Sequence, residues 1–240
     1  MSAYSAVRAI WRQLPEGMRG AFAQTPALRT VINTMSRRLM SHDDIYGDEY
    51  YRSAELLAES SATPIAQSVI RDLAPRTVLD VGCGSGALLA ALAARGIDVT
   101  GLENSEAALT YCRNRGLCVC KFDLRATRLP PMMSHFDLVV SMEVGEHLPQ
   151  RIADRFVDLL TRYANTVVFT AATPGQGGTD HVNEQPHEYW IDKFAKRWFE
   201  YASEQSLAWR MEWERQGTAP WYSRNLMLFR AQPHRLDAST

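Results

Sequence analysis

The sequence predicts an α/β fold in which helices cover both faces of a largely parallel sheet. From residue 77 onward, short segments rich in apolar and β-branched residues alternate with helical segments, a pattern typical of parallel sheets. A first strand begins at Thr77, and later strands are expected at residues 97–102, 117–122, 135–142, 167–171 and 222–230. With 240 residues, the chain is long enough to bury a sizeable core.

The first strand runs into a glycine turn, and the composition of residues 87–94 is strongly helical. Gly82, Gly84 and Gly86 have no Cβ atom, so the backbone of this turn can pass close to a ligand. Asp80 stands at the end of the strand, where burying a charge without a partner is costly. The spacing G-x-G-x-G differs from the G-x-G-x-x-G of dinucleotide-binding folds. Strand, turn and helix together predict a nucleotide cradle.

This stretch resembles motif I of the class I S-adenosylmethionine-dependent methyltransferases. The resemblance implies a Rossmann-like, seven-stranded, mostly parallel sheet that ends in an antiparallel hairpin. We expect residues 207–213 and 225–230 to form that hairpin, with residues 217–220 as the connecting loop. The resemblance also implies that Asp80 and the three glycines bind S-adenosylmethionine.

Further candidates for the cofactor site follow the ends of later strands. Glu103 lies about 20 residues after the glycine turn, where a carboxylate can accept hydrogen bonds from ribose hydroxyls. The alternative is that the negative charge of Glu103 only stabilises the N-terminus of the helix that begins at Ser105. The resemblance implies that Asp123 meets the adenine amino group, that Leu124 flanks the ring, and that Met142 belongs to the same site.

The chain divides into an N-terminal helical extension, residues 1–60, and a methyltransferase domain, residues 61–235. Residues 1–40 are amphipathic and interrupted by prolines. They are interpreted either as a lid, a homodimer arm or a lipid contact, or as helices packed on the flank of the domain.

A tyrosine precedes the core domain in many methyltransferases that this chain resembles, where it closes over the methionine end of the cofactor. The acidic segment at residues 42–52 offers Tyr46, Tyr50 and Tyr51 for that role, and we take Tyr46 as the candidate. These rings would equally serve to pack the first helix onto the sheet.

A second group of chemically active residues follows the fourth strand. Glu143, Glu146 and His147 have the spacing i, i+3, i+4, so on one helical turn they would share a face. Two carboxylates and an imidazole can hold a divalent cation if a further ligand joins them. His181, in the glycine-rich loop after the fifth strand, is the candidate for that ligand because of its position.

The E-x-x-E-H element with a later histidine resembles metal-assisted O-methyltransferases of the ubiquinone-biosynthesis and small-RNA 2′-O-methyltransferase types. The resemblance implies Mg²⁺ or Mn²⁺ bound to the hydroxyls of the substrate. E-x-x-E-H-L also occurs in class I methyltransferases without a metal, and His147 or His181 would then be the catalytic base. Both interpretations stay open, and both activate a hydroxyl for attack on the sulfonium methyl.

Composition limits the classes of partner. The 26 basic and 27 acidic residues give a net charge of −1, so general binding of nucleic acid is not expected. No apolar run approaches the roughly 20 residues of a transmembrane span, and no signal peptide is evident, which favours a cytoplasmic protein.

These observations predict an O-methyltransferase that acts on a hydroxyl of a small molecule such as a sugar, a polyol or another natural product. The alternatives are an RNA-terminal 2′-O-methyltransferase, whose polyanionic partner the balanced charge disfavours, and a non-catalytic cofactor-binding subunit. A nicotinamide-dependent oxidoreductase would need a differently placed third glycine.

Overall fold

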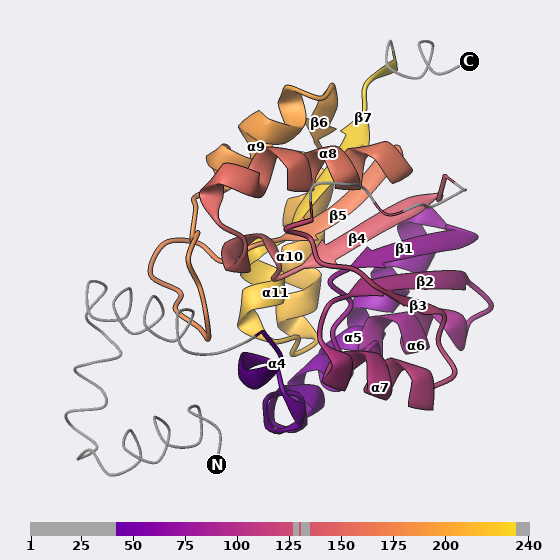
Figure 1. The fold of residues 1–240 in the computed structure, drawn as a ribbon. Coiled ribbons are helices and arrows are strands. Elements are labelled where there is room, and N and C mark those ends of the chain that lie inside the picture. Colours follow the sequence, from indigo (N-terminus) through magenta and orange to yellow (C-terminus); the bar gives the residue numbers. More distant parts are fainter. Residues whose placement is uncertain (1–41, 127–129, 131–134, 234–240) are drawn as a thin grey trace.

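Seven strands form a single mixed sheet in a computed structural model that describes residues 42–126, 130 and 135–233 (Figure 1). The strand order is β3-β2-β1-β4-β5-β7-β6. Neighbouring strands from β1 to β5 pair in parallel, whereas β7 is antiparallel to both β5 and β6. The predicted sheet, mostly parallel with an antiparallel C-terminal pair, is therefore confirmed. The strands are β1 (Thr77–Val81), β2 (Asp98–Glu103), β3 (Val119–Lys121), β4 (Leu138–Met142), β5 (Thr166–Thr170), β6 (Phe199–Tyr201) and β7 (Met227–Ala231).

Helices cover both faces of the sheet. In Figure 1, α8 and α9 lie on one face, and α5, α6 and α10 lie on the other. The predicted division after residue 60 falls inside α5, and residues 1–41 of the predicted extension lie outside the described residues. The helices are α4 (His42–Ile45), α5 (Asp48–Leu73), α6 (Ala87–Ala93), α7 (Glu106–Asn114), η1 (Gly145–His147), η2 (Gln150–Ile152), α8 (Ala153–Tyr163), α9 (His187–Ala195), α10 (Ser203–Arg215) and α11 (Pro220–Asn225).

The core forms two layers because strand side chains alternate between the faces of the sheet. Val78 and Val140 pack with α5, α6 and α10, while Leu79 and Val139 pack with α8 and α9. All four side chains are fully buried. Strands that are apolar on both faces are typical of parallel sheets covered by helices. In the described part of the chain, no helix combines the length and the hydrophobicity that crossing a bilayer requires.

The predicted hairpin is wrong in its first member, because residues 207–213 lie in α10 and the partner of β7 is β6. Leu207, Trp209, Met211 and Trp213 alternate with other residues, which is the period of a strand. Trp209 and Trp213 are also four residues apart, and both are buried. Leu207 and Met211 are each 57% exposed, so the burial follows the period of a helix.

The last strand is also shorter than predicted. Residues 220–225 form α11, with Pro220 in the first turn, where its fixed φ suits a helix. The strand β7 begins only at Met227. The loop predicted at residues 217–220 therefore joins two helices rather than two strands.

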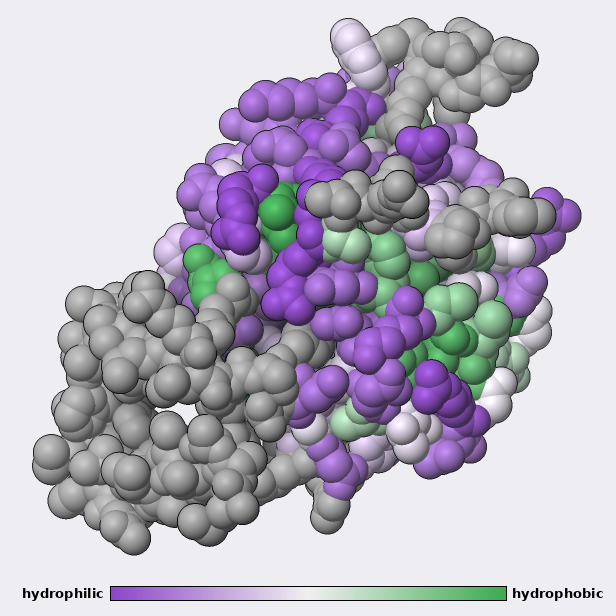
Figure 2. All heavy atoms as spheres, viewed as in Figure 1, coloured by the Kyte–Doolittle hydropathy of each residue, from purple (hydrophilic) through white to green (hydrophobic). Residues whose placement is uncertain are grey.

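Hydrophobic side chains gather near the β2 and β3 end of the sheet in the view of Figure 2, whereas hydrophilic ones cover α8 and α9. The strand at this edge, β3, has only three residues, and Cys118 and Cys120 beside and within it are exposed. A short edge strand offers few unpaired backbone groups to other chains.

Replacing the buried indole of Trp213 should separate the helical assignment of α10 from the predicted strand. Trp213 is fully buried and donates a 3.0 Å hydrogen bond from Nε1 to Ser68 Oγ. We expect Trp213→Ala to lower the free energy of unfolding by about 3–5 kcal/mol, because it leaves a cavity in the core. Met211→Ala, at an exposed site, should change it by less than about 0.5 kcal/mol. Urea unfolding measures the free energy of unfolding of both variants. A similar loss in the two variants would contradict the helix and favour the predicted strand.

Candidate functional site

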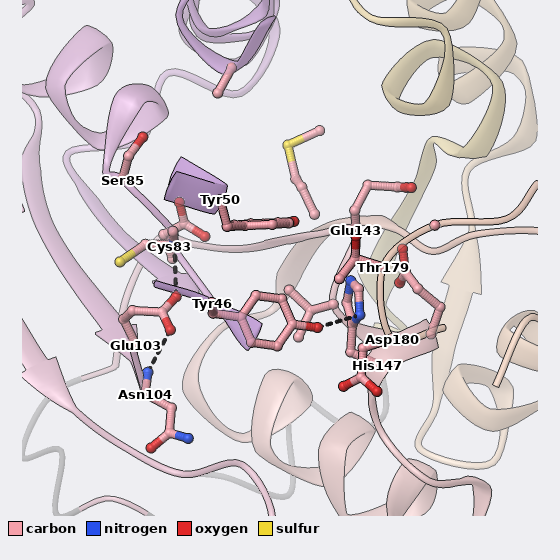
Figure 3. Close-up of a pocket in the computed structure, with 18 of the residues that line it drawn as sticks. Tyr46, Tyr50, Cys83, Ser85, Glu103, Asn104, Glu143, His147, Thr179 and Asp180 are labelled. Carbon is pink, nitrogen blue, oxygen red and sulfur yellow. Dashed lines mark hydrogen bonds between the residues drawn. The ribbon is translucent and has the colours of Figure 1, made fainter. Parts of the chain in front are cut away.

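A cavity of about 580 Å³ lies at the carboxyl ends of β1, β2 and β4 (Figure 3). The glycine turn, the residues that follow β2 and β4, and the loop at residues 176–181 line it, together with parts of α5 and α11. Open α/β sheets bind their ligands at this edge, outside the carboxyl ends of the strands.

The glycine turn folds tightly over the end of β1. Gly82, Gly84 and Gly86 all have positive φ, at 81°, 54° and 78°. A Cβ at Gly82 would lie 2.5 Å from the Val144 side chain, whereas one at Gly84 would meet only Tyr51, at 3.7 Å. Gly82 and Gly84 line the cavity. Gly86 does not; it precedes α6, and a side chain there would collide with Leu117 and Cys112.

Two buried carboxylates lie beside this turn. Glu103 is 8% exposed and accepts hydrogen bonds from the backbone amides of Gly84 (2.9 Å), Asn104 (2.6 Å) and Ser105 (2.9 Å). Asp80 is 5% exposed, and burial raises its pKa to about 7, with the negative charge of Glu103 as the second cause. The amides orient the Glu103 carboxylate, while Asp80 retains its proton up to neutral pH.

The other residues predicted to hold the cofactor line the same cavity, with the exception of Gly86. Asp123, Leu124 and Met142 all belong to the wall. Asp123 Oδ1 accepts hydrogen bonds from the backbone N and from Nε of Arg125, each at 2.9 Å. The structure thus brings residues that follow three different strands to one cavity.

Tyr46 spans the two ends of the cavity. Its phenol oxygen lies 2.9 Å from His147 Nδ1, and its backbone carbonyl accepts a 2.7 Å hydrogen bond from Ser105 Oγ. In Figure 3 its ring lies between Glu103 and His147. Tyr50 also lines the cavity, and burial, with nearby acidic residues, raises its pKa to about 12. This phenol therefore stays protonated at neutral pH.

Three of the four predicted metal ligands come together. Glu146, His147 and His181 each place a ligand atom within 4.8 Å of the other two. Glu146 is fully buried, and neither of its carboxylate oxygens has a hydrogen-bond partner among the described residues. Burial, followed by the charge of Glu143, raises its pKa well above the ordinary value. A buried, unpaired carboxylate beside two imidazoles fits a divalent cation or a proton.

Glu143 does not join this group, and the predicted common helical face is absent. Its φ is 55°, and the helical turn η1 begins only at Gly145. The Glu143 carboxylate instead accepts hydrogen bonds from Gln176 Nε2 at 2.8 Å and Asn225 Nδ2 at 3.0 Å. A left-handed residue turns the chain out of the helical path, so Glu143 and Glu146 do not share a helical face, although they lie close enough for the charge of Glu143 to raise the pKa of Glu146.

The loop after β5 brings His181 to His147. The backbone amides of Val182 and Asn183 donate to the carbonyl of Glu146, at 2.9 and 3.0 Å. The rings of His147 and His181 meet edge to face with their centroids 4.9 Å apart. These contacts hold the loop against η1.

Sequence reasoning missed several residues of this region. Glu184, whose Oε1 lies 2.9 Å from His181 Nδ1, was not identified, although its i+3 spacing from His181 was a usable signal. Asp180 lines the cavity and is buried, with a φ of 60° that the sequence does not reveal. Trp221 and Tyr222 also line the cavity. They were missed because Tyr222 was assigned to a strand.

Comparison with known proteins places a methyltransferase-like region in the middle of the chain. A family model described as a methyltransferase domain matches residues 78–165, which include the glycine turn and the Glu143 to His147 segment. This match and the sheet order support the resemblance to class I S-adenosylmethionine-dependent methyltransferases that the glycine turn indicated.

Individual relatives match parts of the chain. The ubiquinone biosynthesis O-methyltransferase of Pseudomonas paraeruginosa is 42% identical over 82 residues, which cover 32% of this chain and 35% of the relative. The enzyme of the same name from Methylococcus capsulatus is 37% identical over 103 residues, covering 40% of this chain and 44% of the relative. The chain thus spans less than half the length of these curated relatives.

A solved structure matches over a longer stretch. The structure of an amino pentose methyltransferase from Micromonospora echinaspora, with S-adenosylmethionine bound, is 18% identical. It covers 76% of this chain and 96% of its own, with a TM-score of 0.55. At this identity, the likeness shows a common fold.

Asp80 should make the stability of the protein depend on pH. In the native state this carboxyl has a pKa of about 7, against about 3.9 in an unfolded chain. Between these values the native state binds more protons, so the free energy of unfolding falls as pH rises. Asp80→Asn removes this loss. We expect its Tm to exceed that of the wild type at pH 8 and the difference to shrink toward pH 4.

Thermal unfolding from pH 4 to pH 8 measures this difference. Asp98→Asn, at an exposed position at the start of β2, is the matched control and should show no comparable pH dependence. A Tm difference for Asp80→Asn that stays constant across this range would contradict the effect of burial.

Proposed function

We propose that this chain transfers the methyl group of S-adenosylmethionine to a hydroxyl oxygen of a small molecule. The proposal rests on one observation: two sets of residues with different chemistry line the same cavity. The glycine turn with Glu103 forms one end, and the cluster of Glu146, His147 and His181 lies at the other. The first suits an adenosyl ligand, and the second suits activation of an acceptor oxygen.

The cofactor would lie against the glycine turn. Gly84 offers a backbone without a side chain, and the Glu103 carboxylate, oriented by three amides, retains acceptor capacity for ribose hydroxyls. Asp123 would meet the adenine amino group, with Leu124 and Met142 beside the ligand. When bound, S-adenosylmethionine supplies a methyl group on a positively charged sulfur, which suits the acidic wall of this cavity.

The acceptor end would lower the pKa of a hydroxyl or remove its proton. With Mg²⁺ or Mn²⁺ present, Glu146, His147 and His181 would hold the cation, which favours the deprotonated form of a bound hydroxyl. To bind the same cation, Glu143 would have to give up its hydrogen bond from Gln176 or from Asn225. Without a cation, His147 or His181 would take the proton directly. In both cases the cavity holds the two reactants in line, a large part of the acceleration.

A small hydroxylated acceptor fits the available space. The cavity of about 580 Å³ lies within the range of small-molecule sites, and the cofactor itself must occupy a large share. Tyr50, Trp221 and Tyr222 supply aromatic wall for a flat ring or a sugar. The partial matches to O-methyltransferases favour oxygen as the acceptor. The net charge of −1 does not favour an RNA terminus.

Replacing Glu103 should weaken cofactor binding. We expect Glu103→Ala to raise the Kd for S-adenosylmethionine roughly 10- to 100-fold, because hydrogen bonds to a charged group contribute about 1.5–3 kcal/mol. Isothermal titration calorimetry with S-adenosylmethionine, its demethylated product and NAD measures this directly. Glu106→Ala, at an exposed position on α7, is the control. A wild-type protein that binds neither S-adenosylmethionine nor its product would overturn the proposed function.

Removing divalent cations should distinguish the two modes of activation. In an activity screen over hydroxylated sugars and phenols, a cation site predicts loss of turnover in chelator and recovery with Mg²⁺ or Mn²⁺. Full activity in chelator would exclude the metal. In that case we expect His181→Ala to lower kcat by roughly 10²–10⁴-fold while the Kd for the cofactor stays nearly unchanged.

A further inference from the structure

We infer that Asn225, the last residue of α11, is a positioning residue of the acceptor site, because it anchors the glycine-rich loop after β5 to the end of β4. This inference deepens the proposed function and rests on it for the meaning of the acceptor site. The anchoring itself can be tested in the ligand-free protein, without cofactor or substrate.

Three polar side chains from separate parts of the fold form a closed ring of hydrogen bonds. The side-chain amide of Asn225 donates from Nδ2 to Glu143 Oε1 at 3.0 Å and to Gln176 Oε1 at 2.7 Å. The amide of Gln176 donates in turn from Nε2 to Glu143 Oε2 at 2.8 Å. Each side chain therefore contacts both of the others, and removing one member breaks two of the three bonds.

The Asn225 member of the ring is a fixed point. Asn225 is only 1% exposed, and the carbonyl of the next residue, Leu226, accepts hydrogen bonds from Nε and Nη2 of Arg210, at 2.8 and 2.6 Å. Just before α11, the backbone amide of Ala219 donates to Ser61 Oγ at 3.0 Å. These contacts join the two ends of α11 to α10 and α5.

The backbone of Glu143 is also held in place. Its φ of 55° is uncommon for a residue with a side chain. Its amide donates to the carbonyl oxygen of Thr170 at 3.1 Å and to Oγ1 of the same residue at 2.9 Å. A backbone in such a conformation persists only where its surroundings determine it. The ring thus has a second fixed member at the end of β4.

The third member lies in a stretch of the loop that has little else to hold it. Gln176 has the only side chain within residues 175–178, because the other three are glycines. It is exposed, and Gly175 and Gly177 on either side have φ values of 93° and 71°. Glycine has more backbone conformations to lose than any other residue. An anchor at Gln176 therefore restricts this stretch strongly.

The anchored loop supplies part of the wall at the acceptor end. Residues 176–181 line the cavity, so Thr179, Asp180 and His181 follow the anchored stretch directly. Asn225 is not one of the lining residues and acts through Gln176 and Glu143, which are. A misplacement of about 1 Å can cost about 100-fold in rate. Loosening the loop should therefore slow the reaction without affecting the glycine turn.

The direct test is hydrogen–deuterium exchange of residues 173–181 in the ligand-free protein, read by mass spectrometry. Gln176→Ala removes the loop member of the ring, and Asn225→Leu keeps the branched shape of the side chain but removes both donated hydrogens. Each variant loses two hydrogen bonds of the ring. We expect each to speed exchange of this segment roughly 5- to 100-fold.

Combining the two substitutions shows whether Asn225 acts on the loop through Gln176. In a protein that already carries Gln176→Ala, we expect Asn225→Leu to speed exchange of residues 173–181 no further. A further increase in the double variant, or unchanged exchange in Gln176→Ala, would overturn the anchoring role. Gln216→Ala, at an exposed position just after α10, is the matched control and should leave this exchange unchanged.

The circular dichroism spectrum and the Tm show whether each variant folds. Because Gln176 is exposed, Gln176→Ala tests the ring even if the buried Asn225→Leu substitution prevents folding. In that case Asn225→Ser, which is smaller and polar, takes its place in the double variant.

Kinetics connect the anchor to the reaction. With an acceptor from the screen of hydroxylated sugars and phenols, we expect both single variants to lower kcat/KM for the acceptor about 10- to 100-fold while the Kd for S-adenosylmethionine stays unchanged. Faster loop exchange with unchanged kcat/KM would overturn the positioning role. A wild-type protein that does not bind S-adenosylmethionine would instead refute the proposed function. Because loop exchange is measured without ligands, the two failures are distinguishable.

Discussion

The close approach of Gly82 to Val144 sets the distance between the two ends of the cavity. A Cβ at Gly82 would lie 2.5 Å from Val144, so only a residue without a side chain lets the turn after β1 pack directly on the segment after β4. Gly145, the residue after Val144, also has to lack a side chain, because a Cβ there would collide with the ring of Trp190 from α9. The helical turn that carries Glu146 and His147 is thus fixed between the glycine turn and the core.

Acidic groups are buried at both ends of this cavity, and protein stability alone does not account for them. Asp80 and Glu146 are buried, and burial is the main cause that raises the pKa of each. Glu103, by contrast, receives three backbone amides. Carboxyl groups kept in a buried cavity at such a cost are typical of sites that bind a cation or handle protons.

Much of the fold follows from local sequence, because the strands and helices each have a composition that allows few alternatives. The glycine turn and Glu103 could be predicted for the same reason, since they lie at the ends of regular strands. The prediction for residues 207–213 failed because Trp209 and Trp213 fit both a period of two and a period of four, and only packing against Ser68 and Asp72 decides between them. Glu143 differed for another reason, since spacing alone cannot reveal a left-handed residue.

Tyr46 connects the two ends of the cavity a second time, independently of the glycine turn. Its backbone carbonyl accepts a hydrogen bond from Ser105 Oγ, two residues after Glu103. Its phenol oxygen contacts Nδ1 of His147. Tyr46 is buried, precedes the sheet in sequence and lines the cavity, so the residues just before α5 belong to its wall. A shift of Tyr46 would change its contact with His147 and its hydrogen bond from Ser105 together. The two ends of the cavity are therefore linked through the backbone and side chain of one residue as well as through the sheet.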